Sequence, residues 1–573
     1  MTDPQIVLTE RVQQALANAF GPEYADADPL IRPSQFADFQ ANVAMSLAKR
    51  LRRAPREVAT EIAAQLSDFP GTVEVSGPGF LNITLDDSWI ATEASQMFED
   101  PRIGVGTTTP PQTVVIDYSA PNAAKEMHVG HLRTTIVGDS LARTMEHLGN
   151  NVIRQNHLGD WGTPFGMLIE HLLDIGEDAA VAQLEAGMGT EYYQAARAKF
   201  DGDESFKTRS RLRVTTLQSG DPETMRLWHV FMDATVRYFN KVYGMLGVTL
   251  TDADIAGESM YNPMLEQTCD DLEAAGVAVL SEGALCVFPP GFTGSDDKPL
   301  PLIIRKSDGG YGYATTDLSA VRYRVDDLKA DRILYVVGAD QALHFRMVFA
   351  AARQAGWLPD TVSAEHVQIG MMLGKDGRRF KTRSGESVKL MDLLDEAVER
   401  ASAAISERGY DAVLQEEIAH AVGMGAVKYA DLSVSHDSEY VFDFDRMLGF
   451  TGNTGPYMQY ATARIRSIFR RGGYELAALR GPIKVDESAE RALALHLLSF
   501  GAVVEQVAAL AEPHRLCAYL FETASLFSTF YEECPVLKAD AETRSYRLAL
   551  CALTLRVLET GLDLLGVPVP ERM

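Results

Sequence analysis

The chain has 573 residues, of which 46% are hydrophobic and 23% are charged, a composition typical of globular proteins. A chain of this length is expected to form roughly two to four domains. No run of about eighteen or more apolar residues occurs, so we expect no membrane span. The net charge of −26 argues against a protein that coats nucleic acid indiscriminately, but one folded RNA can still bind through local basic patches.

The cysteines give no sign of a structural cross-link. The five cysteines form no CxxC pair, so the sequence indicates neither a disulfide framework nor a zinc site. Reduced thiols packed as small apolar groups are the simplest interpretation. The amino-terminal residues also lack the basic start and apolar core of a signal peptide. We therefore expect a cytoplasmic protein without zinc.

The first block, up to about residue 105, has the pattern of a small α+β module. Apolar residues recur at helical spacing over 7–20 and 41–51. Strand-like stretches at 72–75 and 80–85 flank a Gly-Pro-Gly turn and predict a hairpin. The Thr- and Pro-rich stretch 107–111 is typical of a linker.

The second block, 112–450, alternates apolar β-branched runs with long amphipathic stretches. Strands are predicted at 113–118, 151–155, 302–304 and 332–337, with a helix over 129–148. Strands that alternate with helices predict a parallel sheet of Rossmann type. The stretch of about 165–290 is mainly helical and too long for one crossover, so it is expected to be an insertion.

The third block, 456–573, is almost free of strand signals, and its helical periodicity predicts an all-α bundle. Phe527, Phe530 and Tyr531 form an aromatic stripe that suits either core packing or stacking on bases. Basic clusters at 49–53 and 464–471 suit either a solvated helix face or an RNA contact.

The strongest local signal is the segment 119–131, SAPNAAKEMHVGH, where a predicted strand ends and a helix begins. Ligands bind at this edge of open α/β sheets, and free N–H groups at a helix start favour phosphate. Gly130 permits close approach of a nucleotide, and His128 and His131 share one helix face. Lys125 adds a nearby cation. The alternatives are a chance surface pair of histidines or two metal ligands.

The HVGH string resembles the HIGH signature of class I aminoacyl-tRNA synthetases, and the longer segment 119–139 resembles arginyl-tRNA synthetases. The resemblance continues through all three blocks, at 39–42, 77–80, 156–162, 312–318, 337–344, 455–461 and 570–573. It implies a Rossmann-type catalytic domain over 109–455, with the helical insertion at about 165–290. It also implies an N-terminal α+β module over 1–108 that touches tRNA and an α-helical anticodon-binding domain over 456–573.

The resemblance implies an arginine–tRNA ligase. Such an enzyme activates L-arginine with ATP and Mg²⁺, and transfers it from arginyl-adenylate to the terminal ribose of tRNA(Arg). It is expected to act as a monomer and to have no membrane partner.

The resemblance also implies the binding residues. Asp317 accepts the guanidinium of arginine beside Tyr313, because carboxylate pairs best with a planar fork of donors. Further arginine contacts are expected from Asn122, Gln341 and His131, and more weakly from Asp117 and Ser119. ATP is expected to contact His128, Gly130, His131, Gly338, Met372 and Lys381.

The second signature of class I enzymes, a lysine-rich loop for pyrophosphate, is degenerate in this chain. The matching segment 374–383 reads GKDGRRFKTR, in which Lys381 and Arg383 are the candidate catalytic cations. Lys125 is the candidate for the missing charge, because family members that lack the second lysine carry one just before HxGH. The family also includes enzymes that activate arginine only when tRNA is bound.

Three rival interpretations remain at this stage. A nucleotidyltransferase without RNA shares the HxGH chemistry but leaves the third block unused. A non-catalytic RNA-binding paralogue predicts damage in the motifs, which look intact. A synthetase for another amino acid is disfavoured by Tyr313 and Asp317, which suit a cationic side chain.

Overall fold

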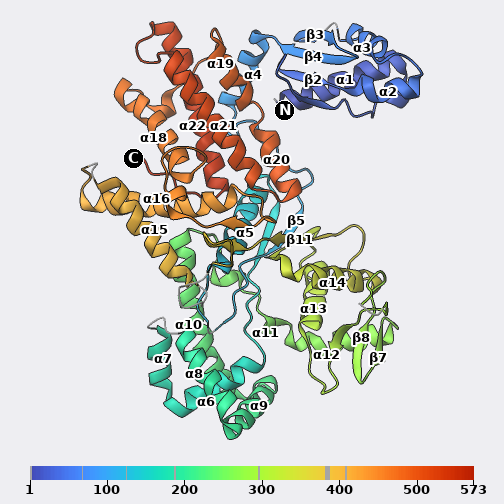
Figure 1. The fold of residues 1–573 in the computed structure, drawn as a ribbon, viewed down its shortest axis with the longest axis vertical. Coiled ribbons are helices and arrows are strands. Elements are labelled where there is room, and N and C mark those ends of the chain that lie inside the picture. Colours follow the sequence, from blue (N-terminus) through green and yellow to red (C-terminus); the bar gives the residue numbers. More distant parts are fainter. Residues whose placement is uncertain are drawn as a thin grey trace.

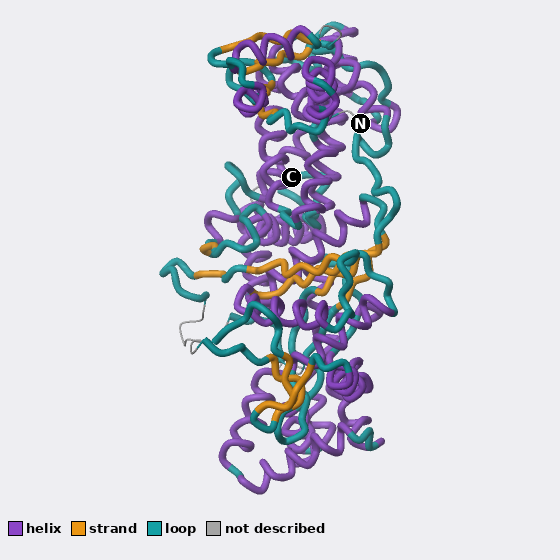
Figure 2. The backbone as a smooth tube through the Cα atoms, turned by 90° about the vertical axis from the view of Figure 1, so that its right-hand side faces the viewer, coloured by secondary structure: helices purple, strands orange, loops and turns teal. Residues whose placement is uncertain are grey.

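A computed structural model describes residues 3–66, 69–123, 125–185, 189–294, 297–380, 388–406 and 409–573 of the chain. A parallel sheet lies near the middle of an elongated molecule, with a mainly helical lobe at one end and the C-terminal helices towards the other (Figures 1 and 2). The N-terminal module lies beside the C-terminal helices (Figure 1). The fold is the predicted Rossmann-type α/β architecture with an N-terminal α+β module and a C-terminal helical domain.

The N-terminal module is a four-stranded antiparallel sheet of order β1-β2-β4-β3 covered by helices. The predicted hairpin is confirmed, with Val73 opposite Ile83. Arg491 anchors the module to the C-terminal helices through Asp38 and Asp87, with N–O distances of 2.8 and 2.6 Å. The elements are α1 (Pro4–Phe20), β1 (Ile31–Pro33), β2 (Phe39–Ala41), α2 (Val43–Leu51), α3 (Pro55–Ala64), β3 (Gly71–Ser76), β4 (Phe80–Leu85) and α4 (Asp87–Glu99).

The central sheet is fully parallel and has the strand order β11-β10-β5-β6. Val114 and Ile116 of β5 pack into one hydrophobic core and Val115 into another, so apolar side chains cover both faces. Burying each such side chain stabilises the fold by about 1.5–3 kcal/mol. The strands are β5 (Thr113–Asp117), β6 (Asn151–Gln155), β10 (Arg332–Gly338) and β11 (Ser363–Ile369), with α5 (Gly130–His147), α13 (Tyr313–Asp326) and α14 (Ala342–Gln354) among the helices between them.

The insertion consists of a helical lobe and a small sheet. The strand predicted at 302–304 exists, but it does not join the parallel sheet: β9 pairs antiparallel with β8 in a separate sheet of order β7-β8-β9. Its side chains alternate between buried and exposed, as in a sheet with one wet face, whereas β5 is buried on both faces. The elements are α6 (Thr163–Ile175), α7 (Glu177–Glu185), α8 (Gly189–Gly202), α9 (Glu204–Gln218), α10 (Pro222–Leu246), α11 (Glu258–Tyr261), α12 (Leu265–Ala274), β7 (Ala278–Ser281), β8 (Ala284–Val287) and β9 (Leu302–Arg305).

The C-terminal region is helical, as predicted. Thr454 caps α18 by accepting from the Tyr457 N–H at 3.3 Å, and Gly473 ends the helix in the left-handed region. The helices are α15 (Leu390–Ile405), α16 (Ala412–Leu432), α17 (Phe444–Met447), α18 (Gly455–Gly472), α19 (Ser488–Leu497), α20 (Phe500–Leu510), α21 (His514–Glu533) and α22 (Ala541–Leu564), and the short strands β12 (Met372–Leu373) and β13 (Tyr440–Val441) pair nearby.

Several smaller sequence predictions concern the interior. Phe527 and Phe530 are buried, which supports core packing for the aromatic stripe. All five cysteines are buried and free. Within the described residues, one stretch, Ser488–Leu510, is long and apolar enough to cross a membrane by length and composition alone. Half of its most apolar window is buried in the structure.

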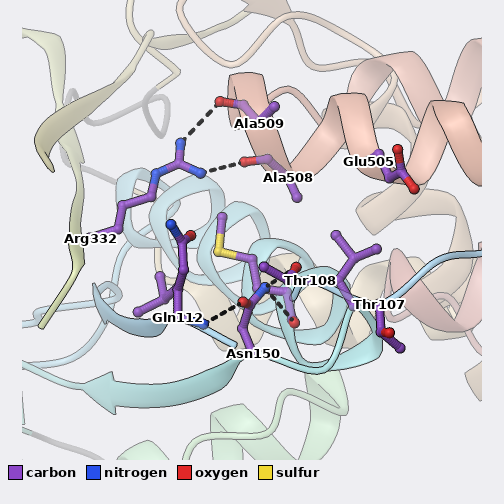
Figure 3. Close-up of a pocket in the computed structure, with 11 residues that line it drawn as sticks. Thr107, Thr108, Gln112, Asn150, Arg332, Glu505, Ala508 and Ala509 are labelled. Atoms are coloured by element: carbon purple, nitrogen blue, oxygen red, sulfur yellow. Dashed lines mark hydrogen bonds between the residues drawn. The ribbon is translucent and has the colours of Figure 1, made fainter. Parts of the chain in front are cut away.

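A cavity of about 340 Å³ lies at the amino ends of the central strands (Figure 3). Arg332 at the start of β10 crosses it to donate to the carbonyl oxygens of Ala508 and Ala509 on α20, at 2.7 and 3.1 Å. The cavity therefore marks the seam between the sheet and the C-terminal helices. The HxGH motif lies beyond the opposite, carboxyl end of β5.

Candidate active site

The conserved geometry of open α/β sheets places a ligand where the strand order reverses. In this sheet the chain leaves β5 for β6 on one side, and β10 then pairs with the other side of β5. The segments that follow β5 and β10 therefore meet at the carboxyl ends of two adjacent parallel strands. They carry the two clearest motifs, 119–131 and 337–344.

The segment after β5 is held close to the segment after β6. Asn122 forms a parallel β-bridge with Gly159, and the Ala123 N–H donates to the Gly159 carbonyl at 3.0 Å. A Cβ on Gly159 would lie 2.4 Å from Oδ1 of Asn122, so glycine permits this approach without displacing the Asn122 side chain. These contacts fix the chain at Asn122 and Ala123, just before the residues that lead to HxGH.

The HxGH motif forms the start of α5, and its backbone sets both imidazole rings. Nδ1 of His128 accepts from the Gly130 N–H at 3.0 Å, and Nδ1 of His131 accepts from the His128 N–H at 3.1 Å. Because Nδ1 is an acceptor in each neutral ring, the proton of each ring lies on Nε2. The two rings pack with their centres 4.0 Å apart. The motif therefore offers two Nε2–H donors at a helix N-terminus.

The surroundings keep both histidines neutral. Burial, with His128 nearby, lowers the pKa of His131 to about 3. Removal from water lowers the pKa of His128, and the cations Arg379 and Lys125 lower it further. Neutral imidazoles at pH 7 act as hydrogen-bond donors and not as cations, which suits charge that develops on phosphate oxygens.

Glu258 lies near two other acidic side chains, Asp160 and Asp317. Asp317 of α13 contacts Nε2 of His344 at 2.6 Å. Glu258 begins α11, and burial, followed by repulsion from Asp160 and Asp317, raises its pKa to about 8. Asp160 itself is buried and accepts from the Ser259 N–H and hydroxyl at 2.8 and 2.6 Å. A cation bound beside these groups would favour the charged form of Glu258 and relieve the repulsion among the three side chains.

Comparison with known proteins decides the family. The family model described as "tRNA synthetases class I (R), catalytic domain" matches residues 95–444, more than half of the chain. The DALR anticodon binding domain matches residues 458–573, and the arginyl tRNA synthetase N terminal domain matches residues 7–85. The chain belongs to the arginyl-tRNA synthetase family.

Individual arginyl-tRNA synthetases agree over the whole length. The arginine–tRNA ligase of Thermobifida fusca is 63% identical over 580 residues, covering 100% of both chains. The ligase of Edwardsiella ictaluri is 48% identical and covers 99% of this chain and 100% of its own. The arginyl-tRNA synthetase of Plasmodium falciparum has 28% identity and a TM-score of 0.85, covering 99% of each chain. The Thermus thermophilus enzyme has 25% identity and a TM-score of 0.80, covering all of both chains.

The family assignment settles the reaction. The protein activates arginine with ATP and charges tRNA(Arg), so arginine, ATP and tRNA(Arg) are its partners. The predicted ligase activity is therefore confirmed.

The remaining residues expected for a synthetase of this family lie around the same edge of the sheet. Tyr313 is 75% exposed at the start of α13, one turn before Asp317. Gly338 is the last residue of β10, and Gln341 is exposed just before α14. Met372 is buried in β12.

Three residues that were expected to contact substrates are buried or have partners within the protein. The carboxylate of Asp117 is buried and pairs with Arg324 of α13 at 2.7 Å, so it supports the helix that carries Asp317. Ser119 is also buried. Nζ of Lys125 lies 4.0 Å from the ring centre of Tyr193 on α8. Lys381 and Arg383 lie outside the described residues.

Glu258 and His344 were not predicted as candidates for the site, although both lie near Asp317. Glu258 stands in the Gly257-Glu258-Ser259 stretch of the insertion, which periodicity describes only as helical. The close fit of Gly257 over Asp160, where a Cβ would lie 2.3 Å from Oδ2, brings it to the site. His344 was part of the family-like string 337–344, but its contact with Asp317 depends on tertiary structure.

Proposed function

We propose that Asp317 and Glu258 bind the guanidinium of arginine while the HxGH helix start binds ATP. The observation that carries this proposal is the pair of neighbouring carboxyl groups of Glu258 and Asp317, which accompanies two neutral Nε2–H donors at the start of α5. A guanidinium pairs with carboxylates through a planar fork of donors, and phosphate favours a helix N-terminus. Tyr313 packs beside the guanidinium, one helical turn from Asp317.

The proposed contacts with the reacting groups follow from position. Asn122, Gln341 and His131 hold the backbone amine and carboxylate of arginine, and Asp117 and Ser119 support them from behind. Gly338 and Met372 line the nucleotide site together with His128, Gly130 and His131. Each glycine allows the nucleotide to approach the backbone without a Cβ in the way.

In the first step, an oxygen of the arginine carboxylate bonds to the α-phosphorus of ATP. The bond from that phosphorus to the bridging oxygen of pyrophosphate breaks, and pyrophosphate leaves. The two Nε2–H groups stabilise the charge on the phosphate oxygens. Lys125, Lys381 and Arg383 are proposed to meet the leaving pyrophosphate. In the second step, a hydroxyl of the terminal ribose of tRNA takes the arginyl group and AMP leaves.

Mg²⁺ is proposed to accompany ATP and to neutralise triphosphate charge. Within the described residues no group of three or more His, Cys, Asp and Glu side chains could hold a metal ion. We propose that the phosphate oxygens of ATP are the donors to Mg²⁺, with water completing its shell.

The proposal extends to organisation and location. We place the tRNA-contacting module at 1–108, the catalytic domain at 109–455 and the anticodon-binding domain at 456–573. The matched family ranges 7–85, 95–444 and 458–573 support three domains in this order. The protein acts as a monomer in the cytoplasm without a membrane partner, and its free cysteines are in keeping with a reducing compartment.

Asp317→Asn tests the assignment of the guanidinium site. The variant keeps the shape of the side chain but removes its charge. The activation free energy that kcat/KM for arginine reports should therefore rise by roughly 2–5 kcal/mol. Citrulline, whose ureido group is neutral, should lose much less. The kcat/KM values for arginine and for citrulline come from ATP–pyrophosphate exchange in the presence of cognate tRNA.

The matched control is Asp326→Asn, the same change at the exposed end of helix α13, which should leave arginine kinetics unchanged. If Asp317→Asn used arginine as well as the wild-type enzyme does, Asp317 would not be the guanidinium acceptor.

A further inference from the structure

The backbone that leaves β5 adopts an unusual conformation. Ser119 and Ala120 both lie in the left-handed region, with φ of 70° and 48°. L-residues with a Cβ disfavour this region, so surrounding contacts must hold the two residues there. The same turn leads directly to Asn122 and then to HxGH.

A buried hydrogen-bond chain supplies those contacts. The Ala120 N–H donates to Oδ1 of Asn156 at 3.1 Å. This bond fixes the orientation of the amide, because only its oxygen can accept. Nδ2 of Asn156 then donates to the hydroxyl oxygen of Tyr243 at 2.9 Å. The Tyr243 hydroxyl then donates its own proton to Oγ of Ser119, 2.8 Å away.

The chain continues to the HxGH motif. Oγ1 of Thr135 lies 2.9 Å from Oγ of Ser119 and 2.6 Å from the carbonyl oxygen of His131. A hydroxyl has one proton and a carbonyl can only accept, so Thr135 donates to His131 and Ser119 donates to Thr135. Every hydroxyl proton in this series of hydrogen bonds therefore has one acceptor.

The side chains of this hydrogen-bond series are buried. Asn156, Ser119 and Tyr243 are 2%, 3% and 4% exposed, and Thr135 is fully buried. Burial also raises the pKa of Tyr243 to about 12, so its hydroxyl keeps its proton. Hydrogen bonds are stronger in a low-dielectric interior, and an unsatisfied member is correspondingly costly. The hydroxyl of Ser119 thus accepts from Tyr243 and donates to Thr135.

Tyr243 joins this chain to a long helix from the insertion. Helix α10 runs from the helical lobe back to the catalytic core (Figure 1). The hydroxyl of its Tyr238 accepts from the Met127 N–H at 3.2 Å, next to His128. The carbonyl of Leu246 at its end accepts from Nζ of Lys428 on α16 at 2.8 Å.

We propose that Tyr243 is a positioning residue for arginine activation. Its hydroxyl holds the turn at 119–122 and the first turn of α5 in their catalytic geometry, although it touches neither substrate. The inference rests on the proposed roles of Asn122 and HxGH. It also gives Ser119 a positioning role and not a direct contact with arginine.

Tyr243→Phe removes the one hydroxyl and leaves Asn156 and Ser119 without their partner. The expected result is a roughly 10- to 100-fold fall in kcat/KM for arginine, because small misplacements of reacting groups cost this much. The KM for tRNA should stay unchanged. Steady-state aminoacylation and thermal unfolding are measured on the same preparations.

Tyr192→Phe is the matched control. The Tyr192 hydroxyl is also fully buried and donates to the Leu168 carbonyl at 3.0 Å, but this bond lies within the helical lobe. The variant should lose thermal stability and keep its arginine kinetics. If Tyr243→Phe behaves like Tyr192→Phe, Tyr243 is merely structural and the proposal is overturned.

A rescue variant separates positioning from general damage. Glycine adopts positive φ readily, so adding Ala120→Gly to Tyr243→Phe should restore part of the lost kcat/KM. No gain from the glycine, with both variants folded, would contradict the proposal. Failure of this experiment leaves the proposed function intact, because the wild-type exchange reaction and Asp317→Asn test that separately.

Discussion

At the residue scale, the site depends on matched protonation states. The two histidines of HxGH are neutral donors because backbone N–H groups occupy their Nδ1 atoms and because their surroundings disfavour a positive charge. Glu258 is held protonated in the neutral pH range by burial and by two neighbouring carboxylates. A bound guanidinium should favour the charged form of Glu258 instead, because the cation attracts the carboxylate.

The pKa of Glu258, about 8, predicts how arginine binding depends on pH. Below this pH the carboxyl group must release its proton when the guanidinium binds, and that release costs free energy. The KM for arginine should therefore rise about tenfold as the pH falls from about 9 to 7, because Glu258 changes from mostly ionised to mostly protonated over that range. Binding calorimetry in buffers of different ionisation enthalpy should show proton release.

Glu258→Gln removes the titrating group and should flatten this dependence, while Glu266→Gln, an exposed position on α12, should keep the wild-type slope. A wild-type KM that stays constant between pH 7 and 9 would show that Glu258 does not meet the guanidinium.

At the element scale, one buried arginine ties α5 to the helices that follow the catalytic sheet. Nε of Arg133 pairs with Asp431 of α16 at 3.0 Å, and its Nη1 donates to the carbonyls of Gly370 and Ser438 at 2.8 and 2.7 Å. Both charged side chains are almost fully buried. Since α5 begins with HxGH, this contact fixes the catalytic helix against α16.

Asp431→Asn should therefore destabilise the protein strongly. It leaves the Arg133 charge buried without a counter-charge, a change that costs about 3–5 kcal/mol of unfolding free energy. Denaturant unfolding monitored by circular dichroism measures the loss. Asp201→Asn breaks an exposed pair with Arg197 and should change little. An equally small effect at both positions would refute the role given to the buried pair.

At the scale of the whole molecule, the C-terminal helices and the active site share a continuous framework. Nε2 of Gln459 on α18 donates to the carbonyl of Ala421 on α16 at 2.8 Å. Lys428, also on α16, donates to the end of α10, which carries Tyr238 and Tyr243 to the site. We therefore expect RNA bound to the C-terminal helices to bias the geometry of the catalytic turn through differential affinity for two states.

Arginine-dependent ATP–pyrophosphate exchange should accordingly be negligible without tRNA and appear when cognate tRNA is added. The expected gain is at least about tenfold, within the range of ordinary coupling free energies. A tRNA that lacks its 3′-terminal adenosine should restore little of the activity. Robust exchange by nuclease-treated, RNA-free enzyme would contradict this coupling and leave the arginine assignment standing.

The sequence alone determined the parts of this protein that rest on local pattern. Continuous apolar runs predicted β5 and β10, because strands buried on both faces need such residues. The edge strand β6, which has the apolar pair Val152 and Ile153, was also predicted and is only partly buried. The HxGH motif was recognisable because His128, Gly130 and His131 are contiguous and follow such a strand. The family resemblance rested on similar contiguous strings.

Tertiary structure alone decided which distant residues meet. The apolar residues at 302–304 suit a strand of the parallel sheet or of the small antiparallel sheet. Pairing with β8 puts this strand in the antiparallel sheet. Glu258 reaches Asp317 and Tyr243 reaches Ser119 across more than fifty residues of sequence. These contacts have no sequence signal, because periodicity reports which face of an element is buried and not which side chain lies opposite it.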